Sequence, residues 1–224
     1  MGNDYERAIA EAGLEIKAIK LRPNDPFTWA SGFRMPIYND NRMFLGDSDN
    51  RGLIGCGFID LMSKDNIHWY GIAGTSTAGI SPATTLADIT ESPMIYVRDK
   101  PKDHGLKNQI EGIDAEKDLE EKSFVLIEDL ISTGGSSARA VQAIRNANGK
   151  CDYCLSIFNY GLDKASKAFD SLDPKCEVRS LLTYDVLLDV AKERGYVDEQ
   201  QVEMLAEWRV DPFGWGGKHG FPKS

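Results

Sequence analysis

The chain has 224 residues, a formal net charge of −9 at pH 7 and a sequence pI of about 4.9. Its hydrophobic fraction of 42% and charged fraction of 27% are typical of a globular protein and argue against a disordered chain. The acidic balance disfavours nucleic-acid binding through a basic face, and no apolar run has the ~20 residues of a membrane span. Four cysteines are too few for a disulfide scaffold, so we expect a cytoplasmic protein.

The first part of the sequence predicts two helices separated by an irregular segment. Apolar residues recur near helical spacing over residues 4–21, and the turn residues at 23–26 end that pattern. We expect short strands and turns over residues 27–42 and a second helix over residues 48–64.

From residue 69 onward, short apolar strands alternate with helices. Because the strands are apolar on both faces, this pattern predicts an α/β fold with a mainly parallel central sheet flanked by helices. A glycine-rich tail at 209–224 follows a single domain and is expected to be loose or to contact another subunit. The predicted strands are 69–73, 94–97, 124–127, 154–158 and 178–182, and the predicted helices are one that ends near residue 88 and those at 137–146, 164–169, 186–194 and 198–208.

The sequence FVLIEDLISTGGSSARA at residues 124–140 has the pattern of a phosphate site. Four apolar residues predict a buried strand, and residues 132–136 form a glycine-containing turn before a helix. Ligands of open parallel sheets bind outside the carboxyl ends of the strands. A turn of this kind presents converging N–H groups, and the start of a helix adds partial positive charge. We therefore expect residues 132–136 to bind a phosphate monoester.

Two carboxylates, Glu128 and Asp129, end the predicted strand and need a different partner, because they repel phosphate. Carboxylates accept hydrogen bonds from sugar hydroxyls and bind Mg²⁺. A phosphate site beside two such acceptors describes a site for ribose 5-phosphate. The absence of Walker and GxGxxG patterns disfavours a P-loop or dinucleotide-binding protein. The alternative is an ordinary strand, turn and helix with a serine cap.

Residues 98–112 carry several cations, among them Arg98, Lys102 and His104, without any apolar periodicity. Such a run is commonly a solvated surface loop. A second interpretation is a mobile lid, whose cations close over a diphosphate and stabilise its departing charge. Closure of this lid would also keep water away from an activated ribosyl donor.

The apolar strand, the Glu-Asp pair and the Ser-Thr-Gly-Gly-Ser turn resemble the phosphoribosyl diphosphate (PRPP) motif of the type I phosphoribosyltransferases. Three further segments resemble parts of the orotate phosphoribosyltransferases. YVRDKPKDHGLKNQIEG at 96–112 resembles their mobile catalytic loop, and FTWASGFRMPIYNDNR at 27–42 resembles their base-binding segment. IAGTSTAGI at 72–80 resembles their diphosphate-contacting loop. The resemblance covers residues 4–208 and implies the type I fold, as one domain at 1–208 with a small hood at 1–45.

The resemblance implies transfer of ribose 5-phosphate from PRPP to orotate, giving orotidine 5′-monophosphate and diphosphate in the biosynthesis of UMP. It implies Mg²⁺ held mainly by PRPP, with Glu128 and Asp129 as candidate further ligands. It also implies a homodimer in which residues 98–112 reach the neighbouring subunit's site. The implied catalytic residues are Lys102, His104 and Arg98. The implied PRPP contacts are these three with Thr75, Ser76, Thr77, Glu128, Asp129, Leu130, Ile131, Ser132, Thr133, Gly134, Gly135 and Ser136. The implied orotate contacts are Ser31, Gly32, Tyr38 and Ser132, with Arg34 and Arg42 as candidates for the orotate carboxylate.

The chain departs from the family at several positions. Ala30 and Met35 stand where relatives have lysine and serine, and Tyr160 lies near the place of an arginine that reads the orotate carboxylate. Asp99 follows the loop arginine, where many members have lysine. Two alternatives therefore stay open. One is a purine or uracil phosphoribosyltransferase, and the other is a transcriptional regulator that senses PRPP without catalysis.

Overall fold

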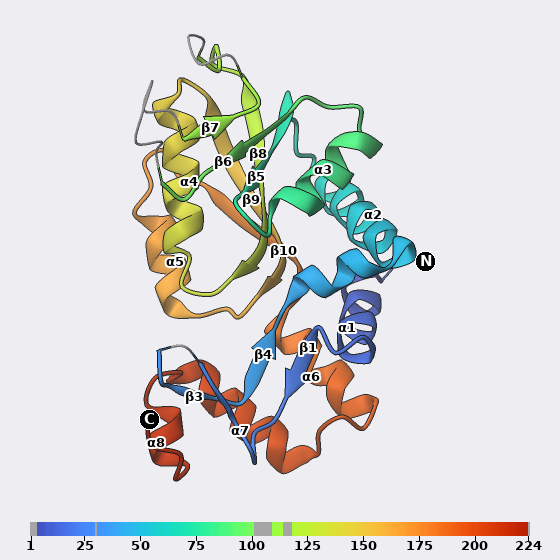
Figure 1. Cartoon of the computed structure of the whole chain (residues 1–224), viewed down its shortest axis with the longest axis vertical. Coiled ribbons are helices and arrows are strands. Elements are labelled where there is room, and N and C mark those ends of the chain that lie inside the picture. The colour runs from blue at the N-terminus through green and yellow to red at the C-terminus, as the bar shows by residue number, and fades with distance from the viewer. Residues whose placement is uncertain (1–3, 30, 101–108, 114–117, 224) are drawn as a thin grey trace.

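A six-stranded sheet of order β10-β9-β8-β5-β6-β7 forms the centre of the larger part of the molecule (Figure 1). The computed structural model describes residues 4–29, 31–100, 109–113 and 118–223. All neighbouring strands of this sheet are parallel except β6 and β7, which are antiparallel. The strands are β5 (Gly71–Thr75), β6 (Met94–Val97), β7 (Ile110–Glu111), β8 (Ser123–Ile131), β9 (Lys150–Asn159) and β10 (Glu177–Thr183).

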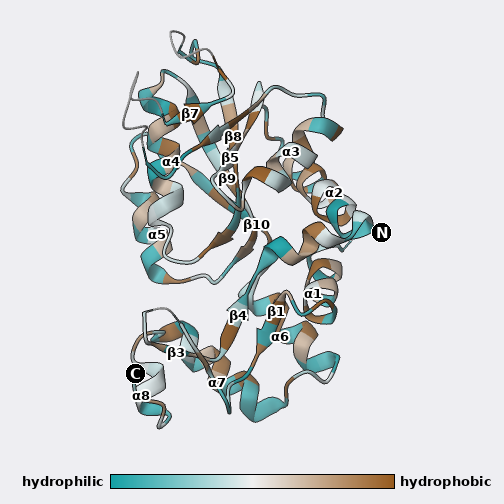
Figure 2. Cartoon of the chain, viewed as in Figure 1, coloured by the Kyte–Doolittle hydropathy of each residue, from teal (hydrophilic) through white to brown (hydrophobic). Residues whose placement is uncertain are grey.

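Helices cover both faces of the sheet, as predicted. Helices α2 (Ser48–Lys64) and α3 (Ile80–Ile89) lie on one face, and α4 (Gly135–Asn146) and α5 (Asp163–Asp170) lie on the other (Figure 1). Strand β8 alternates its side chains between two buried clusters, with Val125 and Ile127 in one and Phe124 and Leu126 in the other. Figure 2 shows the same arrangement, with apolar residues along the sheet and hydrophilic residues on the outer turns of the helices.

A smaller unit lies at the carboxyl end of β10, which leads directly into its first C-terminal helix (Figure 1). It combines segments from both ends of the chain, because α1 packs against α6 and α8 packs against β3. Strands β1 and β4 pair antiparallel, as do β2 and β3. The elements are α1 (Tyr5–Glu15), β1 (Ile19–Leu21), β2 (Phe27–Thr28), β3 (Arg34–Met35), β4 (Ile37–Asn39), the 3₁₀ helix η1 (Asn41–Gly46), α6 (Tyr184–Glu193), α7 (Glu199–Val210) and α8 (Trp215–Lys218).

In this unit the expected extent of the first helix is wrong, and so is one of the two alternatives expected for the tail. The first helix ends at Glu15, because Lys17 has a positive φ of 61° and residues 19–21 then pair with β4. The described part of the C-terminal tail is also not loose. Trp215 is 1% exposed and its Nε1 donates to the Met204 carbonyl at 2.9 Å. Helix α8 of the tail also packs against β3, so the tail covers the β2–β3 hairpin.

Strand β7 has no counterpart among the predicted strands, since two residues are too few to show a period.

Within the described residues, no helix has the length and apolar character needed to cross a membrane.

Candidate active site

Glu128 lies near the carboxyl end of β8, and its side chain is buried. Thr75, the last residue of β5, donates from Oγ1 to Oε1 of Glu128 at 2.6 Å. Ser137, in the first turn of α4, donates from Oγ to Oε2 at 2.9 Å. The backbone N–H of Asp129 also donates to Oε1, at 3.1 Å. Both oxygens of Glu128 are therefore held by groups from three different elements.

Burial raises the pKa of Glu128 to about 7, because an apolar surrounding disfavours the charged form. The hydroxyls of Thr75 and Ser137 act in the opposite direction, since they stabilise the carboxylate, while the neighbouring charge of Asp129 raises the pKa further. Burial also raises the pKa of Asp129, and the nearby Arg42 guanidinium opposes that shift. The pair thus shares less than two full negative charges near neutral pH.

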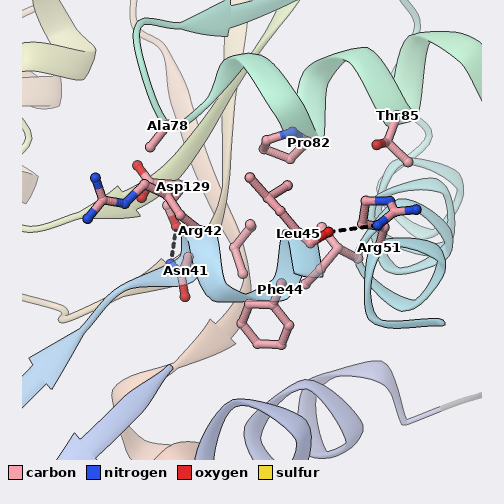
Figure 3. A pocket seen from close by; sticks show the side chains of 11 residues that line it. Asn41, Arg42, Phe44, Leu45, Arg51, Ala78, Pro82, Thr85 and Asp129 are labelled. Carbon is pink, nitrogen blue, oxygen red and sulfur yellow. Dashed lines mark hydrogen bonds between the residues drawn. The ribbon is translucent and has the colours of Figure 1, made fainter. Parts of the chain in front are cut away.

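Asp129 is tied to the smaller unit through η1, which packs against β8. Asn41 Nδ2 donates to the backbone carbonyl of Asp129 at 2.6 Å (Figure 3). Figure 3 also shows the Arg42 side chain beside Asp129, and Asp40 fixes that arginine through two bonds of 2.6 and 2.8 Å. A small, mainly apolar cavity of about 20 Å³ lies against Asp129 between η1, α2 and α3.

The turn after β8 leads into α4 through Gly134, which has a positive φ of 72°. A Cβ on Gly134 would also lie 3.0 Å from the Cα of Ala165, so glycine is required here for two reasons. No side chain caps the start of α4. Its first N–H groups therefore remain available to an anion, as a phosphate site requires.

The second turn, after β5, also depends on a glycine. A Cβ on Gly79 would overlap Thr75 Oγ1 and lie 2.5 Å from the Ile127 carbonyl oxygen. Only glycine lets the start of α3 approach both β5 and β8 this closely. The turn at residues 75–79 is thereby held against the carboxylate pair.

A cavity of about 140 Å³ lies between these turns and brings together residues from three of the segments singled out in the sequence. Arg98 enters it from the end of β6 and pairs with Glu111 at 3.3 Å. The lining residues are Thr75, Ser76, Thr77, Ala78, Val97, Arg98, Asp99, Gln109, Glu128, Asp129, Ser136, Arg139 and Ala140. Lys102 and His104 lie outside the described residues.

Residues 130–135, which were also predicted to contact PRPP, do not line this cavity. Leu130 and Ile131 still belong to β8, and Ile131 is buried in the sheet core. Ser132, Thr133 and Gly134 form the turn and Gly135 begins α4, and contact to a phosphate here would come from backbone N–H groups and hydroxyls. Among the described residues, no cluster of three or more His, Cys, Asp or Glu side chains is arranged to hold a metal ion.

Of the predicted base-binding residues, Ser31, Gly32 and Tyr38 lie on the smaller unit and Ser132 lies in the turn after β8, and none of the four lines the 140 Å³ cavity. Gly32 has a positive φ of 79° in the turn between β2 and β3 and donates its N–H to the Trp29 carbonyl at 2.8 Å. Ser31 precedes it in that turn. Tyr38 is 37% exposed on β4. The hairpin reaches the end of β9, where the Trp29 ring lies 6.5 Å from that of Tyr160.

The two arginines considered for the orotate carboxylate lie in different places. Arg34 faces the C-terminal tail, with its guanidinium 5.8 Å from the centroid of the Phe221 ring. Arg42 lies beside Asp129 (Figure 3). Of the two, only Arg42 stands next to the carboxylate pair.

Sequence reasoning missed three residues of this site. Ser137 and Asn41 each bond to the carboxylate pair or its backbone, but a serine after a serine and an asparagine in a turn give no signal of their own. Arg139 lines the cavity beside Ser136. Arg139 could have been predicted from the sequence, because it follows the predicted phosphate-binding residue Ser136 by three positions, and residues three apart on a helix share a face.

The chain is similar in sequence and fold to known proteins. Residues 58–205 match the family model described as Phosphoribosyl transferase domain. The chain is 43% identical over 211 residues to the orotate phosphoribosyltransferase of Listeria innocua, covering 94% of this chain and 98% of the relative.

Two solved structures of orotate phosphoribosyltransferases share the fold. The one from Aeropyrum pernix is 24% identical, with a TM-score of 0.69, over 85% of this chain and 99% of that chain. The one from Mycobacterium tuberculosis, in complex with PRPP, is 21% identical, with a TM-score of 0.61, over 82% and 98%.

The fold and the family model define a phosphoribosyltransferase, which confirms the fold predicted from the sequence. The Listeria innocua relative, an orotate phosphoribosyltransferase, shows which kind of phosphoribosyltransferase this chain resembles. The chain belongs to the orotate phosphoribosyltransferase family. The family resemblance seen in the sequence and the prediction of a transferase are thus confirmed.

Proposed function

We propose that this protein transfers ribose 5-phosphate from PRPP to orotate, giving orotidine 5′-monophosphate and diphosphate in pyrimidine biosynthesis. The observation that carries this proposal is the position of the carboxylate pair between two glycine-dependent turns, each of which opens a helix. One turn suits a 5-phosphate, the other suits a diphosphate, and the acidic pair between them suits the ribose that joins them. The relative from Mycobacterium tuberculosis whose structure holds PRPP supports this donor.

The roles of the two carboxylates differ in this proposal. Glu128 has both oxygens bonded to protein donors, so it fixes the geometry of the site. Asp129 lines the cavity with part of its surface exposed and accepts hydrogen bonds from the ribose hydroxyls. Backbone N–H groups of residues 132–136 bind the 5-phosphate, and residues 75–77 with Arg98 bind the diphosphate.

A magnesium ion fits this donor set only as a partner of the substrate. The described residues offer one accessible carboxylate of the pair, Asp129, and the other is already occupied. Oxygen ligands from PRPP would therefore supply most of the coordination, with Asp129 the first candidate from the protein and Glu128 the second. Bound there, the ion would neutralise charge on the diphosphate.

The chemistry is a displacement at the anomeric carbon. The deprotonated ring nitrogen of orotate forms the new bond as the bond from that carbon to the diphosphate oxygen breaks, and the diphosphate keeps the electron pair. The sugar carries positive charge in the transition state, as in other glycosyl transfers. The protein holds the reactants in line and stabilises the leaving charge. We assign that stabilisation to Arg98, Lys102 and His104.

Three broader proposals rest on the sequence and the family. The base contacts are Ser31, Gly32, Tyr38 and Ser132. The protein is a homodimer. The loop at 98–112 begins at Arg98 in this chain's own cavity and extends from there to reach the partner's site. It acts in the cytoplasm, which suits its four unpaired cysteines, because reducing compartments keep thiols free.

The ultraviolet absorbance of orotate, followed with PRPP and Mg²⁺, tests the reaction. A change is expected only when all three components and the protein are present, and a chelator should abolish it. Uracil and adenine are the matched controls for the base. Turnover of either control base without turnover of orotate would contradict the proposal.

A further inference from the structure

Arg139 lies on the second turn of α4 and lines the same cavity as Arg98 and Ser76. Its Nη1 atom lies 3.6 Å from the position that a Cβ on Gly135 would take, so the guanidinium lies beside Gly135, at the end of the 132–136 segment where α4 begins. Its Nη2 atom lies 3.5 Å from Oδ1 of Asp99, on the opposite side of the cavity. Arg139 therefore stands between the two segments to which the proposed function assigns phosphoryl groups.

The pair formed by Arg139 and Asp99 is suited to exchange. Their side chains are 66% and 61% exposed, and an ion pair this exposed contributes little because water screens both charges. A phosphoryl group carries more charge than a carboxylate and offers a guanidinium two parallel hydrogen bonds. It can therefore take the place of the Asp99 carboxylate at little cost.

The backbone of Asp99 is held independently of this ion pair. Its N–H donates to Ser76 Oγ at 3.2 Å, and Gln109 Nε2 donates to the carbonyls of Arg98 and Asp99 at 3.1 and 3.4 Å. Only the side chain of Asp99 needs to turn away for Arg139 to become available. The segment that carries Arg98 can keep its place during the exchange.

We propose that Arg139 is a further phosphoryl-binding residue of the donor site, and that Asp99 holds its guanidinium until phosphoryl oxygens of the donor replace the carboxylate. This inference rests on the proposed function, because it requires PRPP in the cavity. PRPP offers a phosphoryl group at each end, and Arg139 lies between the residues assigned to the two ends.

Isothermal titration of the full chain with two separate probes, each in the presence of Mg²⁺, tests the assignment and distinguishes the ends. Inorganic diphosphate reports one end, and ribose 5-phosphate reports the other. Arg139→Gln is expected to weaken binding of at least one probe about tenfold, the value of one charge-assisted hydrogen bond. Arg139→Lys should restore part of the loss, since it keeps the charge without the planar fork. Arg194→Gln, which removes an arginine of similar exposure directly after α6, is the matched control.

A second variant tests the role of Asp99. Asp99→Asn is expected to tighten binding of the same probe severalfold in the wild-type background, because it removes the competing carboxylate. In the Arg139→Gln background that gain should largely disappear. Equal gains in both backgrounds would overturn the exchange, since they would reflect only the change in net charge.

The outcomes separate this inference from the proposed function. If the wild-type protein converts orotate while Arg139→Gln binds both probes normally, the inference fails and the proposed function stands. If the wild-type protein binds neither probe, the inference fails. Absence of orotate turnover in a protein that binds PRPP would overturn the proposed function alone.

Discussion

Thr75 and Glu128 join neighbouring strands of the sheet through a hydrogen bond of 2.6 Å from Thr75 Oγ1 to Glu128 Oε1. This contact lies one residue beyond the register pair of Gly74 and Ile127. Ser137 bonds to the other oxygen of the same carboxylate. Glu128 is thus the common acceptor that fixes the turn after β5 and the start of α4 relative to each other.

The raised pKa of Glu128 predicts that stability depends on pH. Its value of about 7 in the folded protein lies above the ordinary 4.5, so between these pH values the folded state binds more protons than the unfolded state. The free energy of unfolding should therefore fall as pH rises from about 4.5 to 7, by up to about 3 kcal/mol from this group. Denaturant unfolding at pH 5, 6, 7 and 8 measures this, and Glu128→Gln should show a smaller fall. An unchanged pH profile in that variant would contradict the assignment.

Removing a donor from Glu128 should cost stability and affinity together. Thr75→Val leaves one buried carboxylate oxygen with one donor fewer, which costs about 1–3 kcal/mol of unfolding free energy. It should also weaken PRPP binding, because the two turns lose their shared contact. Thr75→Ser keeps the hydroxyl and should recover most of both. Denaturant titration and calorimetry provide the two readouts, and full activity in the valine variant would argue against this role.

Asp129 is assigned to the ribose hydroxyls, so Asp129→Asn should weaken PRPP binding about tenfold or more. Binding of orotate should change little. Asp163→Asn removes a carboxylate from α5 and serves as the control. PRPP titrations that coincide for wild type and Asp129→Asn would exclude the contact.

Lys102 is assigned to the leaving diphosphate. Lys102→Ala should lower turnover by about 10²–10³, the usual cost of losing one donor to developing charge. Its thermal unfolding should match that of the wild type. Lys100→Ala removes a nearby cation and should have a smaller effect. Turnover near the wild-type rate in Lys102→Ala would rule out this role.

The strands of the central sheet were predicted well because each one is marked by a short apolar run in the sequence. Apolar runs such as residues 124–127 are readable as buried strands without any knowledge of their neighbours. The end of the first helix was missed because Ile19 continues the helical spacing of the residues before it. The helix cannot continue because residues 19–21 pair with β4, whose residues lie about 20 positions later in the sequence.

The two halves of the site were predictable to different degrees. The glycine turn and the carboxylate pair lie together in the sequence, so their chemistry could be read from it. The different roles of Glu128 and Asp129 could not, because they depend on hydroxyls from β5 and α4. The pairing of Arg139 with Asp99 likewise joins residues 40 positions apart.

A crystal structure of the protein with PRPP and Mg²⁺ would show which groups of the chain bind each part of the donor. We expect the 5-phosphate within hydrogen-bond distance of the N–H groups of residues 132–136, and the ribose hydroxyls at Asp129. PRPP bound elsewhere, or with its sugar turned away from Asp129, would contradict this expectation.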